Sequence, residues 1–481
     1  MGRTNQLELI YALNLQNMRA ETVQNLVTRG MSGGAAEAKA ELFARCARAL
    51  SSPAKDELLR AFYVPGRIEL LGKHTDYAGG RSILAAAERG FCALATVRSD
   101  NLVKMADAAD ASGATRTEFA IHADLQPTLG HWSNYPMTVA RRLARNFPGA
   151  LRGADIAFAS DLPPASGMSS SSALVVLSFL VLSAVNRLDE RDEYRRDITS
   201  PELLAGYLGT VENGQNFGTL HGDRGVGTFG GSEDHTAILC CQPGRFSQYS
   251  YCPVVFEKTI PMPSDHTLAI GVSGVIAEKT GHALERYNRV SRLASAILDL
   301  WRRETGRADQ TLAAAARSSA DAPAELNRII QSSDEATNRR IDVGEIRRQA
   351  MLDRLGQFLV ENEYIIPSAD DALARRDLTR FGELVDRSQK LAESGLGNQT
   401  PETAFMAESA RQNGAVAASA FGAGFGGSVW AMVPLAPAPS FLDLWQRAYR
   451  ERFPQCAARA SFFLTNPGPS AAELVGGWWG S

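Results

Sequence analysis

The stretch VPGRIELLGKHTDYAGG, residues 64–80, gathers Lys73, His74, Asp76 and Tyr77 between glycines. Apolar alternation just before Gly72 predicts the end of a strand, and the glycine then releases the chain into a turn. Polar side chains clustered where a strand becomes a loop are typical of a site that grips a polyhydroxylated ligand. A solvated turn is the alternative that this stretch alone leaves open.

A second candidate site follows the predicted strand ADIAFASDL, residues 154–162. Pro163, Pro164 and Gly167 lead into four serines at 169–172 and then into a strongly apolar helix. Small residues let the backbone approach a ligand closely, and the N–H groups at a helix start favour a phosphate anion. The hydroxyls can also reach Mg²⁺. A capped helix is the alternative, although capping needs one serine and not four.

Two further stretches have both a chemical and a structural interpretation. Asp234 lies between a glycine-rich loop and a buried run, where it can serve as a catalytic carboxylate or cap a helix. Trp132 and Tyr135 begin a basic amphipathic helix, where they can stack on a flat ring or belong to the core. The stretch FGAGFGGSVWAMV, residues 421–433, places four glycines before a strand and permits close backbone approach.

Composition narrows the classes of function. The chain has 481 residues, a net charge of −3 and 44% hydrophobic residues, which are typical of a globular enzyme with two or three domains. A balanced charge attracts neither nucleic acid nor an anionic membrane, so we expect neither as a partner. The six cysteines lack metal-binding spacing, and the start lacks a secretory pattern. We therefore interpret the protein as cytoplasmic, with reduced thiols.

Changes between helical and β-rich sequence patterns divide the chain into three parts. Residues 1–60 carry helical patterns, which we interpret as an N-terminal helical extension. Residues 61–262 begin with short β-rich runs and form a first lobe with both candidate loops. Residues 263–481 combine strands with long helices and form a second lobe. We expect the site to lie in a cleft between the two lobes.

Three glycine-bounded segments thus fall in order: GRIELLGKHTDYAGG, PPASGMSSSSAL and GAGFGGSVWAMV. Together they resemble the three motifs of the GHMP kinase superfamily, and the HTDY tetrapeptide resembles the galactokinase branch. WSNY at 132–135 and ERYN at 285–288 support this branch. The resemblance runs from about residue 42 to residue 434. It implies an α+β fold with two lobes, the first like domain 2 of ribosomal protein S5 and the second ferredoxin-like.

A P-loop NTPase is the nearest rival for the first segment. The pattern fails twice, because five residues separate Gly66 from Gly72 where four are needed, and His74 stands where Ser or Thr must bind Mg²⁺.

The resemblance implies an enzyme that transfers the γ-phosphoryl group of ATP to the anomeric hydroxyl of a galactose-like sugar. Asp234 would accept or orient the anomeric proton, and Arg67 would keep it ionised and offset the charge of the phosphoryl group. The remaining matches give sugar contacts at Lys73, His74, Asp76, Tyr287 and Gly231, ATP contacts at Trp132, Asn134, Tyr135, Gly167, Ser169, Ser170, Ser171 and Gly424, and Mg²⁺ ligands at Ser171 and Glu212.

Lys73 is the sharpest departure from the family, which has a glutamate that binds the C6 hydroxyl at this position. An ammonium group donates hydrogen bonds and attracts negative charge. One hypothesis is that Lys73 faces a carboxylate at C6, so that the substrate is a uronic acid such as galacturonate. The other is that Lys73 pairs with Glu69 or Asp76 and leaves a neutral hexose site. Ala165, Met168 and His235 also depart from the family, but none of these changes removes a catalytic group.

A catalytically silent regulator that binds sugar and ATP is the alternative from a different class of protein. Such a protein would be free to lose Asp234, Arg67 or Glu212, and all three are present. The expected partners are a small-molecule sugar and ATP, and the expected assembly is a monomer or weak homodimer.

Overall fold

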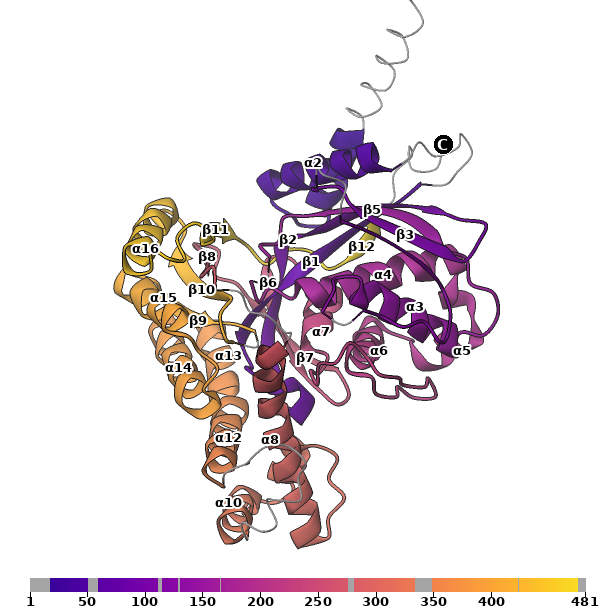
Figure 1. Cartoon of the computed structure of the whole chain (residues 1–481). Helices are drawn as coiled ribbons and strands as arrows, with labels where there is room; N and C mark the ends of the chain where they lie inside the picture. The colour runs from indigo at the N-terminus through magenta and orange to yellow at the C-terminus, as the bar shows by residue number, and fades with distance from the viewer. Residues whose placement is uncertain are drawn as a thin grey trace, which may run out of the picture.

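The computed structural model describes residues 18–50, 59–110, 115–128, 130–164, 166–275, 281–333, 348–422 and 424–474, leaving out the side chains of 281–287. Helices and strands are mixed in two lobes (Figure 1), as predicted. Within the described residues, no helix combines the length and the apolar character needed to cross a membrane.

The N-terminal lobe is built on an eight-stranded sheet. Its main path runs in the order β12-β1-β2-β5-β3-β4, and β6 pairs with both β2 and β7. The long strands β1 and β2 are antiparallel, and the loop with His74 and Asp76 joins them. The bounds of the strands are β1 (Leu59–Leu71), β2 (Arg81–Val97), β3 (Leu102–Asp107), β4 (Arg116–Ala120), β5 (Ala154–Ser160), β6 (Arg245–Ser250), β7 (Val255–Pro261) and β12 (Ala472–Leu474).

Successive side chains of a strand point to opposite faces of the sheet. Apolar side chains lie on both faces here, and helices cover both of them. Phe62 and Val64 belong to the large core beneath α4, whereas Ala61 and Tyr63 pack in the cluster that contains α2. Helix α2 lies against β2 and β5. The helices are α2 (Gly33–Ala49) on one face and α3 (Asn134–Asn146), α4 (Ser170–Asn186), α6 (Pro201–Asn213) and α7 (Glu233–Cys240) on the other, with the short α5 (Asp192–Asp197) beside them.

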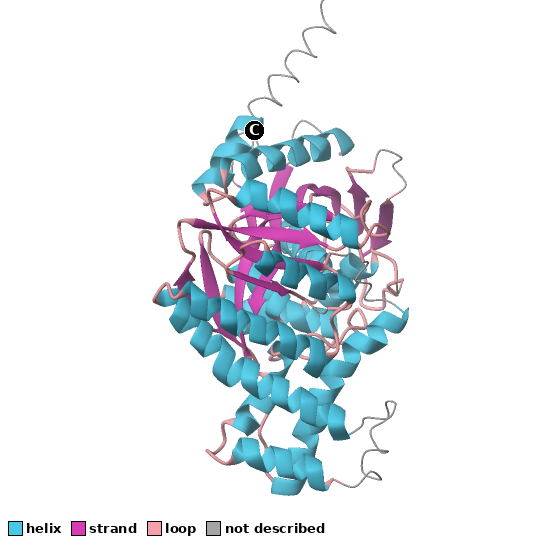
Figure 2. Cartoon of the chain, turned by 90° about the vertical axis from the view of Figure 1, so that its left-hand side faces the viewer, coloured by secondary structure: helices cyan, strands magenta, loops and turns pink. Residues whose placement is uncertain are grey.

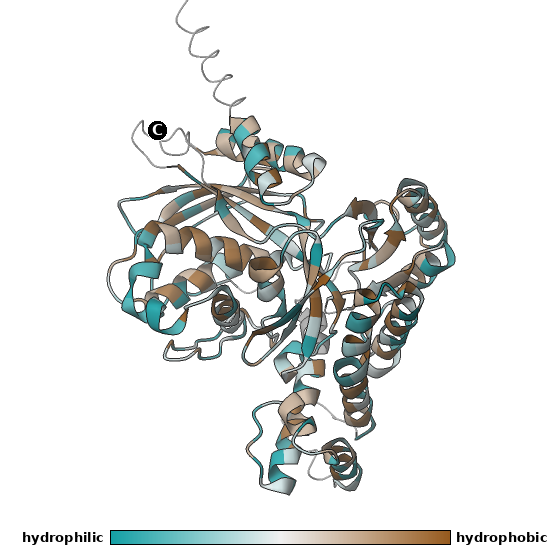
Figure 3. Ribbon diagram, turned by 180° about the vertical axis from the view of Figure 1, so that it is seen from behind, coloured by the Kyte–Doolittle hydropathy of each residue, from teal (hydrophilic) through white to brown (hydrophobic). Residues whose placement is uncertain are grey.

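The C-terminal lobe contains a four-stranded antiparallel sheet in the order β11-β8-β10-β9. A strand, helices, two strands, a helix and a last strand in this order make the ferredoxin-like arrangement that the resemblance predicts. Figure 3 shows hydrophobic residues concentrated where helices and strands meet in both lobes. The elements are β8 (His266–Val272), α13 (Ile366–Ala374), α14 (Leu378–Leu391), α15 (Pro401–Gln412), β9 (Ala417–Ala420), β10 (Ser428–Pro434), α16 (Ala438–Arg452) and β11 (Ser461–Thr465).

A helical arm with its own apolar core projects from the C-terminal lobe and lies below both sheets in Figure 2. Ile297 and Trp301 of one helix pack there against Leu326, Met351 and Leu355 of two others. The helices of the arm are α8 (Gly281–Thr305), α9 (Leu312–Ala316), α10 (Ala322–Ser332) and α12 (Arg348–Val360).

Two features modify the expected division of the chain. The helix α2 does not stand apart as an extension, because Phe43 and Cys46 are fully buried in a cluster with the first sheet. The C-terminal part of the chain also does not belong entirely to the second lobe, because β12 pairs with β1 in the sheet of the first lobe. The boundaries at 60 and 262 therefore describe the order of elements in the sequence better than their packing.

Candidate active site

The three glycine-bounded segments meet at one place. Pairing of β1 with β2 is irregular between Pro65 and Arg67, and the Arg67 N–H donates instead to the Met168 carbonyl at 3.1 Å. Irregular pairing of this kind re-aims a side chain, here the guanidinium of Arg67. The Ser428 hydroxyl donates to the Ser166 carbonyl at 2.6 Å, so the third segment is fixed to the second.

Glycine is required at this junction. A Cβ on Gly422 would come within 3.0 Å of the Gly167 carbonyl oxygen and 3.3 Å of Arg67 Nη2. Gly422 also has a φ of 78°, where side chains are disfavoured. The glycines thus let the backbone of all three segments close around Arg67.

Arg67 and Asp234 form an ion pair in the cavity between these segments. Arg67 Nε donates to Asp234 Oδ1 at 2.8 Å, and the side chains are 5% and 19% exposed. Burial by itself lowers the pKa of Arg67. The nearby carboxylates of Asp234, Glu69 and Glu233 outweigh this effect, so the pKa lies above its ordinary value. Arg67 therefore stays charged, and its charge favours the ionised form of Asp234.

A serine, a glutamate and a histidine lie beside Asp234. The Ser172 hydroxyl donates to Glu212 Oε2 at 2.9 Å and lies 3.3 Å from Asp234 Oδ2. His235 Nε2 lies 3.1 Å from the same oxygen of Glu212. Among the described residues, no three acidic, histidine or cysteine side chains form a metal-binding group. A carboxylate and a hydroxyl nevertheless fit Mg²⁺ that is held mainly by substrate phosphates.

Two of the sugar contacts predicted from the first segment, His74 and Asp76, line the same cavity. Asp76 Oδ2 accepts from the backbone N–H of Glu233 at 3.2 Å, and His74 Nδ1 lies 3.0 Å from the Tyr77 hydroxyl. A Cβ on Gly231 would approach Asp76 Oδ2 to 2.4 Å, so glycine is needed there. Burial raises the pKa of Asp76 to about 6, against the hydrogen bonds that it accepts.

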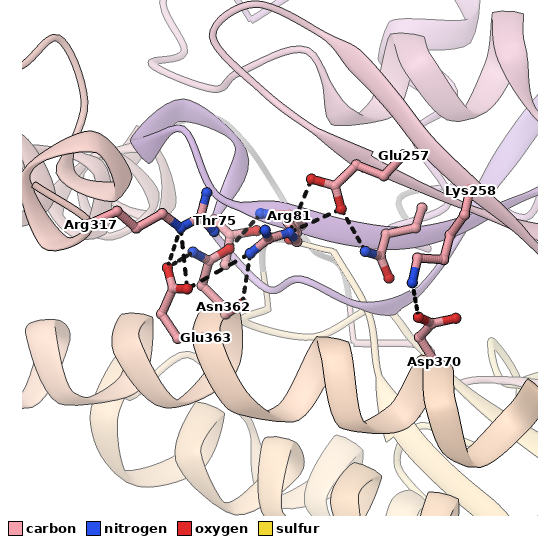
Figure 4. Close-up of polar contacts among 9 residues, drawn as sticks. Thr75, Arg81, Glu257, Lys258, Arg317, Asn362, Glu363 and Asp370 are labelled. Carbon is pink, nitrogen blue, oxygen red and sulfur yellow. Dashed lines mark hydrogen bonds and ion pairs between the residues drawn. The ribbon is translucent and has the colours of Figure 1, made fainter. Parts of the chain in front are cut away.

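The loop that carries these residues is fixed at its far end to the C-terminal lobe (Figure 4). The Arg81 N–H donates to Asn362 Oδ1 at 2.7 Å, and Arg81 Nε donates to both oxygens of Glu257. The Thr75 hydroxyl donates to the Arg81 carbonyl at 2.6 Å. Lys258 pairs with Asp370 nearby. These contacts hold the loop rigidly, which pre-orders its side chains for a ligand.

Lys73 does not line the cavity. Its side chain is 1% exposed, and its ammonium group donates to the Ser419 hydroxyl at 2.8 Å and lies 3.5 Å from that of Ser388. Ser388 in turn donates to the buried Glu361, whose pKa burial raises and Lys73 lowers. Within the described part of the chain, Lys73 is not among the residues that line the cavity and forms no ion pair with Glu69 or Asp76. Lys73 instead joins the first segment to α14 and β9.

The phosphate loop has the conformation of a tight cradle. Gly167 and Ser169 have φ values of 73° and 60°, and α4 begins at Ser170. The Ser169 hydroxyl is buried without a hydrogen-bond partner in the described structure. Ser170 and Ser171 are half-buried in the first turn of the helix. Their N–H groups are the ones that a helix start offers to phosphate.

The residues predicted near adenine are partly in the core. The Trp132 ring packs 5.6 Å from that of Phe158, and Asn134 is buried and donates to the Val226 carbonyl at 3.3 Å. Tyr135 packs at the edge of the large core. Gly424, with a φ of 79°, lies against Asn398. Tyr287 belongs to α8, but its side chain lies outside the described residues.

The structure adds further residues to those expected from the sequence, three of which bear on the chemistry. Ser172, Glu69 and Glu233 line the same cavity as Arg67 and Asp234. A signal was available for each of them, since Ser172 ends the run of serines, Glu233 precedes Asp234, and Glu69 lies two residues after Arg67. The full lining is Arg67, Glu69, His74, Asp76, Tyr77, Ser172, Glu212, Thr228, Gly230, Gly231, Glu233, Asp234, His235 and Gly422.

Comparison with known families identifies the segments. Residues 53–97 match the galactokinase galactose-binding signature, residues 134–215 the GHMP kinases N terminal domain, and residues 370–451 the GHMP kinases C terminal family.

Comparison with known proteins points the same way. The chain is 26% identical to a galactokinase of Fusobacterium nucleatum, over 86% of this chain and 94% of that protein. It is 25% identical to a galactokinase of Bacillus subtilis, over 87% and 96%. Its fold is similar to that of Lactococcus lactis galactokinase complexed with galactose, with a TM-score of 0.69 over 90% of this chain and 98% of that one, at 24% identity.

In order along the sequence, this chain therefore carries the galactokinase galactose-binding signature, the GHMP kinases N terminal domain and the GHMP kinases C terminal domain.

Proposed function

We propose that the protein is an ATP-dependent sugar 1-kinase that acts on a neutral, galactose-type sugar. The observation that carries this proposal is the Arg67–Asp234 pair at 2.8 Å, which lines one cavity together with His74 and Asp76. The pair supplies an ionised carboxylate, and His74 and Asp76 supply groups that bind hydroxyls. The galactose-binding signature over residues 53–97 and the curated galactokinases that resemble this chain support the choice of sugar.

In the proposed reaction, Asp234 accepts the proton of the anomeric hydroxyl while that oxygen forms a bond to the γ-phosphorus. The bond from the γ-phosphorus to the oxygen that bridges to the β-phosphate breaks, and ADP leaves with this electron pair. Arg67 holds Asp234 in the ionised form and lies where negative charge builds on the phosphoryl group. The backbone of residues 166–171 binds the phosphates at the start of α4.

Glu212 and Ser172 are the residues that we propose to hold Mg²⁺, rather than Glu212 and Ser171. A bound Mg²⁺ ion would neutralise part of the phosphate charge. Ser172 is the better ligand because its hydroxyl already contacts Glu212 at 2.9 Å, whereas Ser171 lies one residue back on the helix. Successive residues of an α-helix point about 100° apart, so the two serines cannot serve the same position.

The charges that line the cavity favour a neutral sugar over a uronic acid. Five carboxylates, those of Glu69, Asp76, Glu212, Glu233 and Asp234, surround one arginine and two histidines. A sixth carboxylate on the substrate would be repelled. The cation that suggested a uronic acid, Lys73, is bound to Ser419 instead. A cytoplasmic location and a monomer or weak homodimer stay predictions.

The test is the release of ADP by the purified protein with galactose, other hexoses, pentoses and galacturonate, and identification of the product as the 1-phosphate. We expect turnover of galactose and little or none of galacturonate. Asp234→Asn should lose turnover by about 10²–10⁴-fold and keep sugar binding. If sugars bind but none elicits ADP release, the regulator is the correct assignment. More efficient turnover of galacturonate than of galactose would contradict the neutral substrate.

A further inference from the structure

A second cavity, unassigned by the proposed reaction, lies beside the sugar cavity. Its volume of about 430 Å³ is within the range of roughly 300–1,000 Å³ that is common for small-molecule sites. Its walls come from α6, from the loop 229–232, from the segment 252–254 and from α8. The lining residues used below are Thr210, Phe217, Phe229, Ser291, Arg292 and Ser295.

The two cavities adjoin on the sugar side of the proposed active site. Both are lined by Tyr77, Gly230 and Gly231, whereas Arg67 and Asp234 line only the first. A substituent that extends from a sugar in the first cavity into the second cavity would therefore be attached to that sugar away from the reacting anomeric hydroxyl. Phosphoryl transfer would proceed unchanged with such a group in place.

The second cavity has the surface chemistry of a carbohydrate site. Aromatic rings of Phe217 and Phe229 stand beside hydroxyls of Thr210, Ser291 and Ser295. A sugar ring has apolar C–H faces that pack on aromatic rings and hydroxyls that bond at its edges. Among the described lining residues the charged groups are one acid, Glu202, and one base, Arg292. This balance gives neither an anionic nor a cationic ligand an advantage.

The aromatic wall is held in place and open to a ligand. Phe229 is 46% exposed, an unusual exposure for so large an apolar ring, and the Arg292 guanidinium lies 5.5 Å from its centre. The Phe229 N–H donates to Asn288 Oδ1 at 3.0 Å, and Asn288 Nδ2 donates to the Gly227 carbonyl at 3.3 Å. Asn288 thus fixes residues 227 and 229 to α8 and pre-orders Phe229.

We propose that the second cavity binds a further sugar ring, attached to a non-anomeric hydroxyl of the sugar in the first cavity. The preferred substrate is then a neutral disaccharide whose reducing-end sugar is of the galactose type. This inference rests on the proposed function, since it takes the first cavity to hold the sugar that is phosphorylated. It adds the size of the substrate and the residues that select it.

The test compares galactose with disaccharides that have a free reducing-end galactose and a second hexose at O2, O3, O4 or O6. For at least one linkage we expect a kcat/KM about tenfold or more above that of galactose. Ser295→Trp, which fills the second cavity from α8, should lower that value about tenfold and change the value for galactose less than about twofold. Ser295→Ala, which removes the hydroxyl without filling the cavity, is the matched control and should lower the value for the disaccharide much less than Ser295→Trp does.

Three outcomes decide the inference. Turnover of galactose with poorer turnover of every disaccharide would overturn it, as would an equal effect of Ser295→Trp on both substrates, or none. If no sugar is phosphorylated, the proposed function fails, and calorimetric titration with the same disaccharides still decides the second cavity. Binding by wild type that Ser295→Trp abolishes and Ser295→Ala retains would support the inference, and absence of binding would overturn it.

Discussion

Arg67 Nε donates a 2.8 Å hydrogen bond to Asp234 Oδ1, and this pair links the bent end of β1 to the first turn of α7. Two further carboxylates approach the same guanidinium, Glu69 at 3.6 Å and Glu233 at 3.8 Å. One cation therefore offsets several buried acids. Loss of the Arg67 charge should therefore lower both the stability of the fold and the rate of the reaction, and the two effects can be measured separately.

Replacing Arg67 by glutamine should lower kcat by at least about 100-fold and destabilise the protein by about 3–5 kcal/mol, because buried carboxylates lose their counter-charge. Steady-state kinetics and urea unfolding measure the two effects. The double variant Arg67→Gln/Glu69→Gln is the control, and should recover part of the stability and none of the activity. Recovery of both would show that Arg67 acts only in folding.

The raised pKa of Asp76 predicts that the free energy of unfolding falls as the pH rises. The folded state raises this pKa from 3.8 to about 6, so it binds the proton more tightly than the unfolded chain. The contribution of the protonated carboxyl is complete below pH 3.8 and is lost as pH rises through about 6. Asp76→Asn removes the titration, so it should gain about 3 kcal/mol relative to wild type between about pH 4 and pH 8.

Urea unfolding of both proteins across this pH range measures the difference. The control is Asp124→Asn, whose carboxylate is 79% exposed and should show little relative change. A constant difference between Asp76→Asn and wild type at all pH values would contradict the assignment.

The adjacent serines of α4 should respond differently to loss of the hydroxyl. Ser172→Ala removes the 2.9 Å contact with Glu212, so we expect it to raise the Mg²⁺ concentration needed for half-maximal rate by about tenfold or more. Ser171→Ala is the matched control, and we expect a much smaller effect. Initial rates against free Mg²⁺ at saturating sugar and ATP measure both. A larger effect of Ser171→Ala would restore the ligand set expected from the sequence.

Lys73 should prove to be a structural residue. Lys73→Met leaves Glu361 buried without its nearby cation, and a destabilisation of about 3–5 kcal/mol is expected for breaking such a pair. The ratio of galactose to galacturonate turnover should not change, because the ammonium group lies outside the cavity. Thermal unfolding and the substrate ratio are the measurements. Lys73→Met/Glu361→Gln should regain stability, whereas a changed substrate ratio would place Lys73 at the sugar.

Much of the fold and of the site was predictable because the chemistry is concentrated in short segments. The two lobes followed from the resemblance of the three glycine-bounded segments to the GHMP kinases, and comparison confirmed that resemblance. Arg67, His74, Asp76, Glu212 and Asp234 were named from the sequence, and the structure brings them to one cavity. Their roles in catalysis and binding stay predictions until the variants are measured.

Other features depend on how distant segments pack. The ammonium of Lys73 meets Ser388 and Ser419, which lie 315 and 346 residues further along the chain. Sequence spacing cannot show such contacts. The sequence prediction named Ser171 as the Mg²⁺ ligand among four consecutive serines, and spacing cannot show which of their hydroxyls meets Glu212. Ser169 has a left-handed conformation and α4 begins at Ser170, and this start of the helix turns Ser172 toward Glu212.

The sequence by itself determined the resemblance to the GHMP kinases and predicted the reaction and several of the groups that line the cavity, because those residue types occur in short, ordered segments. Only the tertiary structure decided which side chains face the ligand. Burial against the C-terminal lobe directs Lys73 away from the cavity, and the rotation of α4 brings the Ser172 hydroxyl to Glu212. The second cavity also exists only in the fold, because α6 and α8 must come together to form it.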